Sequence, residues 1–98
     1  MRKYYKIYYS SFSEEDGDYQ MIKLFDDKHK KEAEAYFNTV AEAEILYAHA
    51  NDLIIDRKGN NICTHDEDST FCMMLMLTEV VSDEDFAFDD GSFFTIEI

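Results

Sequence analysis

Histidine and cysteine are the residues of this sequence best suited to catalysis or metal binding, and there are three of the first and two of the second. Cys63, His65 and Cys72 offer three soft ligands, but the paired Cys-x-x-Cys spacing of structural zinc sites is absent. The acidic run at 83–91 lacks the alternating Asp or Asn positions and the terminal Glu of a calcium-binding loop. No Ser or Cys is placed so that the sequence indicates a nucleophile beside its base. We therefore expect a protein that is not an enzyme and that holds no metal or cofactor.

Carboxylates are the other side chains of this sequence that could form a functional site, and acidic residues greatly outnumber basic ones. The sequence has 22 acidic residues against 9 Lys and Arg, for a formal net charge of −13. The excess is uneven, because residues 32–98 contain sixteen acids and only two bases, Arg57 and Lys58. Loops that merely solvate the protein would explain any one acidic cluster, but they explain this shortage of bases less well. The charge pattern therefore favours a cationic partner.

Most of the acids are clustered in segments that we expect to be loops between strands. In an extended segment, carboxylates two residues apart point the same way at roughly 6.6 Å, close to twice the roughly 3.4 Å spacing of phosphates along one DNA strand. Carboxylates arranged in this way can imitate phosphates. The triplets that we expect to bind a partner are Asp66, Glu67 and Asp68 together with Asp83, Glu84 and Asp85, followed by Glu14, Glu15 and Asp16.

The N-terminal part of the chain has the pattern of a β-hairpin. Residues 3–12 and 19–25 are rich in strand-forming residues that alternate between two faces. Between them lies an acidic turn at 13–18, in which Gly17 can adopt a positive φ.

Four further strands are expected beyond residue 52. Residues 53–55 and 62–63 flank a turn at 56–59 and predict a second hairpin. Residues 71–81 are apolar on both alternating faces and predict a central strand, although a buried helix rich in Met and Leu would give a similar pattern. Residues 93–98 predict the last strand.

One main helix is expected at residues 39–51. Thr39 and Glu42 fit a capping box at its start, and Asn51 is suited to its end. The residues expected to face the core are Val40, Ala43, Leu46, Tyr47 and Ala50. Residues 32–37 alternate and predict a short strand before this helix, and the competing interpretation is a single helix from about 28 to 51.

Together these elements predict one domain, residues 1–98, of the α+β class: a mostly antiparallel sheet with the helix across one face. A hydrophobic content of 46% argues against disorder. Tyr4 and Tyr8, on the outward face of the first strand, indicate either a binding patch or a two-sided sheet. No apolar run is long enough to span a membrane and no signal-peptide core follows Met1, so we expect a cytoplasmic protein without membrane contact. We also expect a monomer rather than a dimer.

In its size, its acidity and its lack of catalytic motifs, the chain resembles the small phage-encoded anti-CRISPR proteins and other inhibitors that mimic DNA. The segment 33–62, which contains N-T-V-A-E-A and L-I-I-D-R-K-G-N-N, is also similar to a segment of small phage proteins from Gram-positive hosts. In length and charge, the chain looks most similar to the acidic inhibitors of the type I-C surveillance complex. The resemblance implies that a basic, nucleic-acid-binding subunit of a CRISPR-Cas complex is the partner and that the protein does not bind nucleic acid itself. A phage-encoded inhibitor of this kind would act in the host cytosol.

Two functional hypotheses follow from the sequence. In the first, an acidic surface that mimics DNA blocks the nucleic-acid-binding groove of a host defence complex. In the second, the chain is an acidic protein–protein interaction module or a homo-oligomer subunit whose partner is unrelated to nucleic acid.

Overall fold

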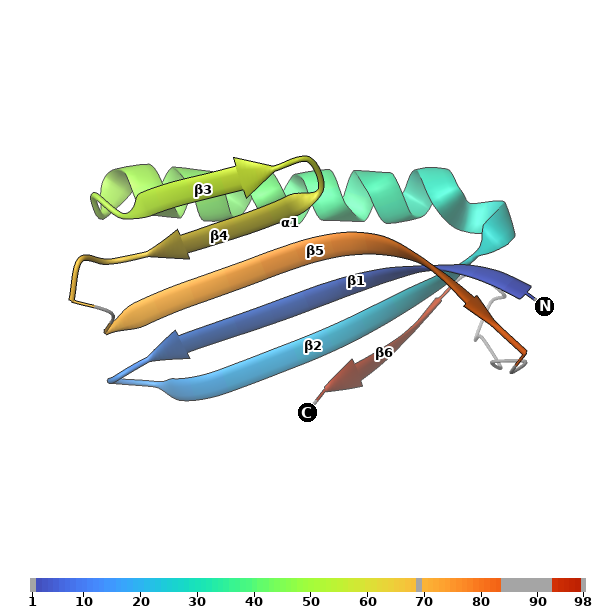
Figure 1. Ribbon diagram of the computed structural model, residues 1–98, viewed down its shortest axis with the longest axis horizontal. Coiled ribbons are helices and arrows are strands. Elements are labelled where there is room, and N and C mark those ends of the chain that lie inside the picture. The colour runs from blue at the N-terminus through green and yellow to red at the C-terminus, as the bar shows by residue number, and fades with distance from the viewer. Residues whose placement is uncertain (1, 69, 84–92, 98) are drawn as a thin grey trace.

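A computed structural model describes residues 2–68, 70–83 and 93–97, and within them the chain forms a six-stranded sheet and one α-helix (Figure 1). The strands are β1 (Arg2–Ser13), β2 (Gly17–Asp26), β3 (Ile54–Lys58), β4 (Asn61–His65), β5 (Phe71–Ser82) and β6 (Phe93–Glu97). A short 3-10 helix, η1 (Asp27–His29), leads into α1 (Lys30–Ala50). The strand order is β3-β4-β5-β1-β2-β6, and each neighbouring pair is antiparallel. The predicted α+β class is therefore confirmed.

The centre of the sheet is the pair β1 and β5. These two twelve-residue strands pair along their whole length, from Arg2 opposite Ser82 to Ser13 opposite Phe71. The prediction of a central strand at 71–81 is confirmed, and the alternative of a buried helix there is wrong. The segment forms a strand and not a helix because β5 is hydrogen-bonded to a neighbouring strand on each side, to β1 and to β4.

Both predicted hairpins are present, but the second one turns later than expected. β1 and β2 are joined by a short turn that ends at Gly17, whose φ is +78°. In the second hairpin Lys58 pairs with Asn61, so residues 56–58 belong to β3 and not to the turn. Gly59, with φ of +60°, is the first residue of this two-residue connection, the position at which a type II′ turn requires glycine.

The helix begins about nine residues earlier than the capping-box pattern indicated, so the predicted strand at 32–37 is wrong and the competing long helix is right. Asp26 initiates it: its carboxylate accepts a hydrogen bond from the Lys28 amide at 3.0 Å and lies 2.5 Å from Nδ1 of His29. Thr39 is mid-helix, and its hydroxyl donates to the carbonyl of Ala35 at 2.9 Å instead of capping a new helix. The end of the helix at Asn51 is confirmed, and Asp52 follows it with φ of +54°.

The earlier start changes which side of α1 faces the sheet. The buried residues of α1 are Ala33, Phe37, Ala41 and Ala48. Leu46, which the sequence pattern placed toward the core, is 70% exposed, and Ala43 and Ala50 are exposed as well. That pattern was read from residue 39 onward and so left out Phe37, the largest side chain that α1 buries.

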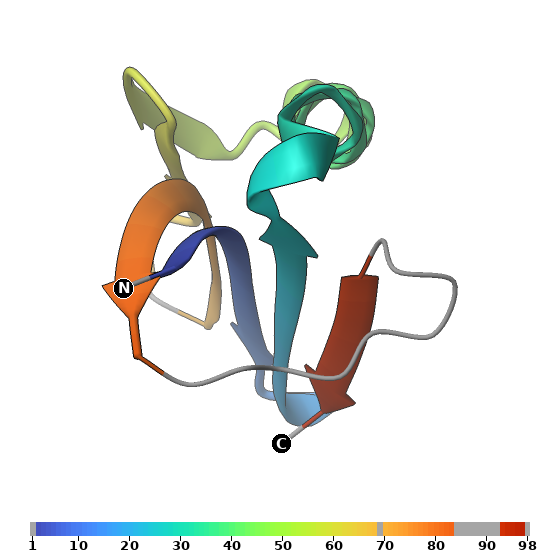
Figure 2. The same cartoon turned by 90° about the vertical axis from the view of Figure 1, so that its right-hand side faces the viewer.

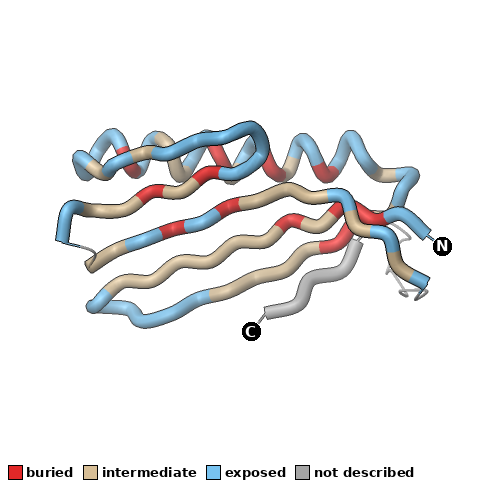
Figure 3. Tube along the Cα trace, in the orientation of Figure 1, coloured by how far each residue is buried: buried red, intermediate tan, exposed pale blue. Residues whose placement is uncertain are grey.

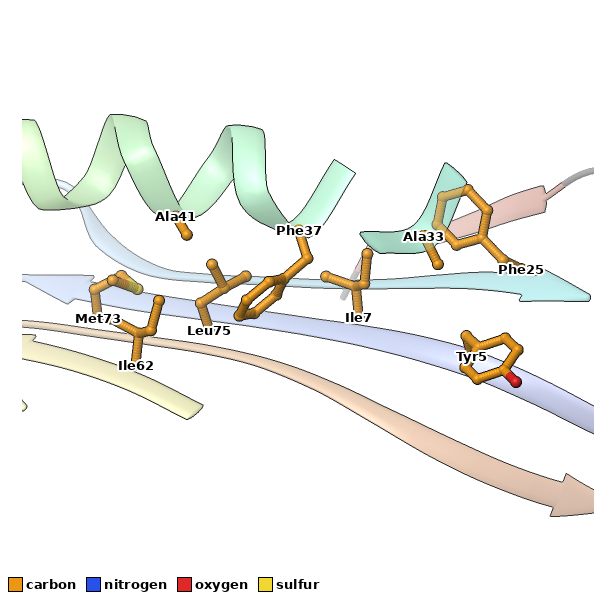
Figure 4. Packing of buried hydrophobic residues seen from close by; sticks show 9 residues of the cluster. All are labelled: Tyr5, Ile7, Phe25, Ala33, Phe37, Ala41, Ile62, Met73 and Leu75. Carbon is orange, nitrogen blue, oxygen red and sulfur yellow. The ribbon is translucent and has the colours of Figure 1, made fainter. Parts of the chain in front are cut away.

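The core lies between α1 and one face of the sheet, as Figure 4 shows. Its nine buried members are Tyr5, Ile7, Phe25, Ala33, Phe37, Ala41, Ile62, Met73 and Leu75. Alternation along β5 shows which face α1 covers, because Met73 and Leu75 are buried while Cys72 and Met74, which alternate with them, are exposed (Figure 3). Figure 2 shows α1 end-on, lying along one side of the twisted sheet. The other face is covered in places: Tyr4, predicted on an outward patch, is only 2% exposed.

Candidate partner-binding site: the acidic end of the sheet

The turn after β1 and the loop before β5 meet at one end of the molecule, on the left of Figure 1. The backbone amide of Glu14 donates to the carbonyl of Thr70 at 3.0 Å, which ties the turn to the loop. The side chains of Glu14, Glu15 and Asp16 are exposed. Two of the three predicted triplets, 14–16 and 66–68, are therefore brought together although they are distant in sequence.

The C-terminal end of α1 lies at the same end of the sheet. Ile54 pairs with His65, so Asp52, just before β3, is close to the start of the β4–β5 loop. We call this region the acidic end; its carboxylates belong to Glu14, Glu15, Asp16, Asp18, Asp52, Asp66, Glu67 and Asp68. The segments that build it, residues 10–22, 43–56 and 60–77, contain no Lys or Arg.

The basic residues gather elsewhere. Seven of the nine lie at or near the start of β1, the end of β2 and the start of α1, and these are Arg2, Lys3, Lys6, Lys23, Lys28, Lys30 and Lys31. Several carboxylates are also found there, and Lys3 forms an ion pair with Glu79 at 3.1 Å. The hydrogen bond that the Lys3 ammonium donates to the Glu79 carboxylate raises the pKa of Lys3. Among the described residues, the excess of acids is thus concentrated at one end of the molecule.

Asp83, the first residue of the third predicted triplet, is not part of the acidic end. Asp83 is exposed and follows Ser82, the far end of β5. Ser82 is about 36 Å from Phe71 if each of the eleven steps between them rises about 3.3 Å. Glu84 and Asp85 lie outside the described residues. Residues 66–68 and 14–16, by contrast, lie at the same end of the sheet.

Asp66 differs from its two neighbours, because its carboxylate is used inside the loop. It accepts hydrogen bonds from the Thr70 amide at 2.8 Å, from the Phe71 amide at 3.2 Å and from the Thr70 hydroxyl. The Thr70 hydroxyl bond, assisted by the two backbone amides, lowers the pKa of Asp66. Asp66 therefore shapes the loop, and Glu67 and Asp68 are the exposed acids that it presents.

Beside the acids lies an aromatic groove that sequence reasoning missed. One cavity of about 330 Å³ is lined by Tyr9, Ser11, Ala43, Glu44, Tyr47 and Phe71. A second, of about 290 Å³, is lined by Ser13, Glu14, Glu15, Asp16, Tyr47, Thr70 and Phe71. Because both share Tyr47 and Phe71, they adjoin, and we treat them as one groove with an acidic rim. Tyr47 was assigned to the core from its helical spacing, so no signal in the sequence pointed to this role.

A hydrogen bond across the groove links the sheet to the helix. The Tyr9 hydroxyl donates to Oε1 of Glu44 at 2.9 Å. Partial burial, reinforced by the Glu44 carboxylate, raises the pKa of Tyr9 to about 12. The phenol therefore stays neutral at physiological pH and continues to donate, which holds Glu44 at the groove wall.

Cysteine and histidine do not form a metal site in the described part of the chain. Cys63 and Cys72 are free thiols, and the His65 ring is 3.0 Å from the carbonyl oxygen of Asp66. No group of three His, Cys, Asp or Glu side chains among the described residues is arranged to hold a metal ion.

The described helix is not long and apolar enough to cross a membrane.

Comparison with known proteins identifies no family for this chain. No protein-family model, no curated protein and no solved structure matches this chain.

Proposed function

We propose that this protein binds a basic, nucleic-acid-binding surface of another protein through its acidic end and thereby competes with nucleic acid. The observation that carries the proposal is the junction between Glu14 and Thr70, which gathers two exposed acidic clusters in a region built without Lys or Arg. The protein acts as a competitor and not as an enzyme.

Electrostatics accounts for how such a surface would work. Exposed carboxylates on two adjacent loops attract the same Lys and Arg side chains that bind phosphates, and they accelerate encounter with a basic groove. Burying them against bases offsets the mutual repulsion that a net charge of −13 imposes on the free protein.

The resemblance in size and charge to phage-encoded anti-CRISPR proteins suggests the target class. The proposed target is a basic subunit of a CRISPR-Cas surveillance complex, with the type I-C complex as the first to test. The site of action is then the host cytosol, and the acidic end occupies the path of the target DNA.

The test is a competition assay with purified type I-C complex and a labelled target duplex. The parent protein is expected to displace the duplex, and displacement should weaken steeply as salt rises, because exposed charge pairs are screened. A pull-down from host lysate at low and high salt extends the test to other targets. Partners that bind no nucleic acid, or competition that is unaffected by neutralising the acidic end, would refute the proposal.

A second candidate is a homodimer that forms through the face of the sheet opposite α1, because apolar side chains are exposed on that face. Met74 is 39% and Ile54 is 45% exposed on this face, and Cys72 is exposed beside them. Four strands about 4.8 Å apart and about eight residues long offer roughly 500 Å², less than the roughly 800 Å² per partner of a standard interface. Such a dimer is weak, and salt should strengthen it by screening the repulsion between two −13 chains. Light scattering at rising salt therefore separates it from the acidic-end interaction, whose salt dependence has the opposite sign.

A further inference from the structure

The chain's own lysines cover aromatic rings at the end opposite the acids. Nζ of Lys23 lies 4.1 Å from the centre of the Tyr36 ring, and Nζ of Lys30 lies 5.8 Å from the centre of the Tyr5 ring. Both distances are within the range of cation–π attraction. Aromatic rings near the start of α1 are thus paired with cations from the same molecule.

The acidic end also has neighbouring aromatic rings, but within the described residues no lysine lies over them. The rings of Tyr47 and Phe71 are 5.7 Å apart and together form the wall shared by the two cavities of the groove. Tyr47 is 49% exposed. The segments that surround it contribute carboxylates, from Glu44 on one side and 14–16 on the other, and contain no Lys or Arg.

The shape of the groove limits what it can hold. Each cavity, at about 330 and 290 Å³, is at the lower limit of the roughly 300–1,000 Å³ of small-molecule sites. A single side chain fits that volume, whereas a large cofactor does not. Rings on the wall and carboxylates on the rim select a side chain that is flat and positively charged.

We propose that the groove binds an arginine side chain of the partner, with its guanidinium stacked on Tyr47 and its N–H groups directed at the rim carboxylates. This inference rests on the proposed function and makes it more specific, since it names the residue type that the acidic end recognises. Arginine is preferred to lysine because its planar guanidinium stacks on aromatic faces and forms paired hydrogen bonds with a carboxylate. Glu44 remains available for such bonds because Tyr9 engages only one of its oxygens.

Two synthetic peptides test the inference: an Arg-Gly repeat and a Lys-Gly repeat of equal length and charge. Calorimetric titration of the parent protein should show about two- to fivefold tighter binding of the arginine peptide, the range expected for an exposed cation–π contact. Tyr47→Leu should abolish this preference, and amide shifts on titration should centre on Tyr47 and Phe71. The matched control is Tyr36→Leu, on the same helix, whose ring already carries Lys23 and whose loss should leave the preference unchanged.

The outcomes separate this inference from the proposed function. Substituting Glu14→Gln, Glu15→Gln and Asp16→Asn should weaken both peptides together, because it removes charge from the rim and leaves the rings and the Glu44 carboxylate in place. Equal affinity of the parent for the two peptides, or a preference that survives Tyr47→Leu, would overturn the arginine groove and leave the acidic surface standing. Peptide affinities that respond to neither substitution would overturn both.

Discussion

The amide of Glu14 donates a hydrogen bond to the carbonyl of Thr70, and this contact brings two acidic clusters to the same end of the molecule. It joins the turn between β1 and β2 to the loop between β4 and β5, across strands that are paired side by side. Asp83 lies beyond the opposite end of β5, so it belongs to a different part of the surface.

Neutralising either cluster of the acidic end should weaken competition with nucleic acid. Glu14→Gln, Glu15→Gln and Asp16→Asn form one variant, and Glu67→Gln with Asp68→Asn forms another that spares the structural Asp66. Each should lower affinity about 5- to 50-fold, mainly by slowing association, because exposed charges act chiefly on the rate of encounter. Biosensor kinetics against the captured partner would measure this.

The control removes the same charge from the other end of the molecule. Glu32→Gln, Glu34→Gln and Asp83→Asn change three exposed acids there. Affinity should change by less than about threefold, since these sites are separated from the acidic end by more than a Debye length of about 8 Å. An equal loss in this variant would show that net charge, and not the acidic end, determines binding.

Replacing Tyr9 by Phe should change the response of stability to alkaline pH. The folded pKa of about 12 is above the ordinary value of 10.0, so the neutral phenol stabilises the fold fully below pH 10, and this contribution disappears as pH rises from 10 through 12. After discounting for its half-exposed position, we expect it to amount to about 1 kcal/mol. Urea unfolding at pH 8 and pH 11.5 would measure it, and an unchanged difference between the two pH values in Tyr9→Phe would contradict the assignment.

Paired alanine substitutions in α1 test which side of the helix packs on the sheet. Phe37→Ala should cost about 3–5 kcal/mol of unfolding free energy, because it leaves a cavity where a side chain is 1% exposed. Leu46→Ala, at a residue that is 70% exposed, should cost less than about 0.5 kcal/mol. Chemical denaturation gives both values, and the reverse order would restore the packing that the sequence pattern predicted.

Asp66→Asn should loosen the loop before β5. The hydrogen bonds that lower the pKa of Asp66 stabilise the fold above pH 3.8, the ordinary carboxyl pKa, and are lost as pH falls through the lowered folded value. The substitution should therefore speed hydrogen exchange at the amides of Thr70 and Phe71 and remove this part of the acid sensitivity. Exchange rates equal to those of the parent would show that the carboxylate does not hold the loop.

Local sequence determined most of the sheet. Strand-forming residues that alternate between two faces marked β1 and β2, and a run that is apolar on both faces marked β5. The glycines at 17 and 59 marked the two hairpins, because each adopts a positive φ that other residues avoid. These features depend on neighbours along the chain, so they can be read without the fold.

Tertiary structure decided the extent and orientation of the helix. Asn38 and Thr39 prefer helix ends. The capping-box pattern of Thr39 and Glu42 involves only residues close in sequence, so it predicted a new helix start without reference to the sheet. Packing of Ala33 and Phe37 against the sheet keeps the chain helical through Asn38 and Thr39. Burying the Ala33 and Phe37 side chains outweighs the small cost of placing two polar residues inside a helix. The core-facing side of α1 follows from this contact and could not be read from residues 39–51 alone.

The candidate site also combines features that the sequence predicts with features that only the tertiary structure decides. Composition identified the acidic clusters and the shortage of bases, since charge is a property of the sequence itself. Which clusters meet depends on strand order, because β5 pairs antiparallel with β1 and so places the start of one beside the end of the other. The groove depends on Tyr47 and Phe71 meeting between helix and sheet, a long-range contact that no local pattern encodes.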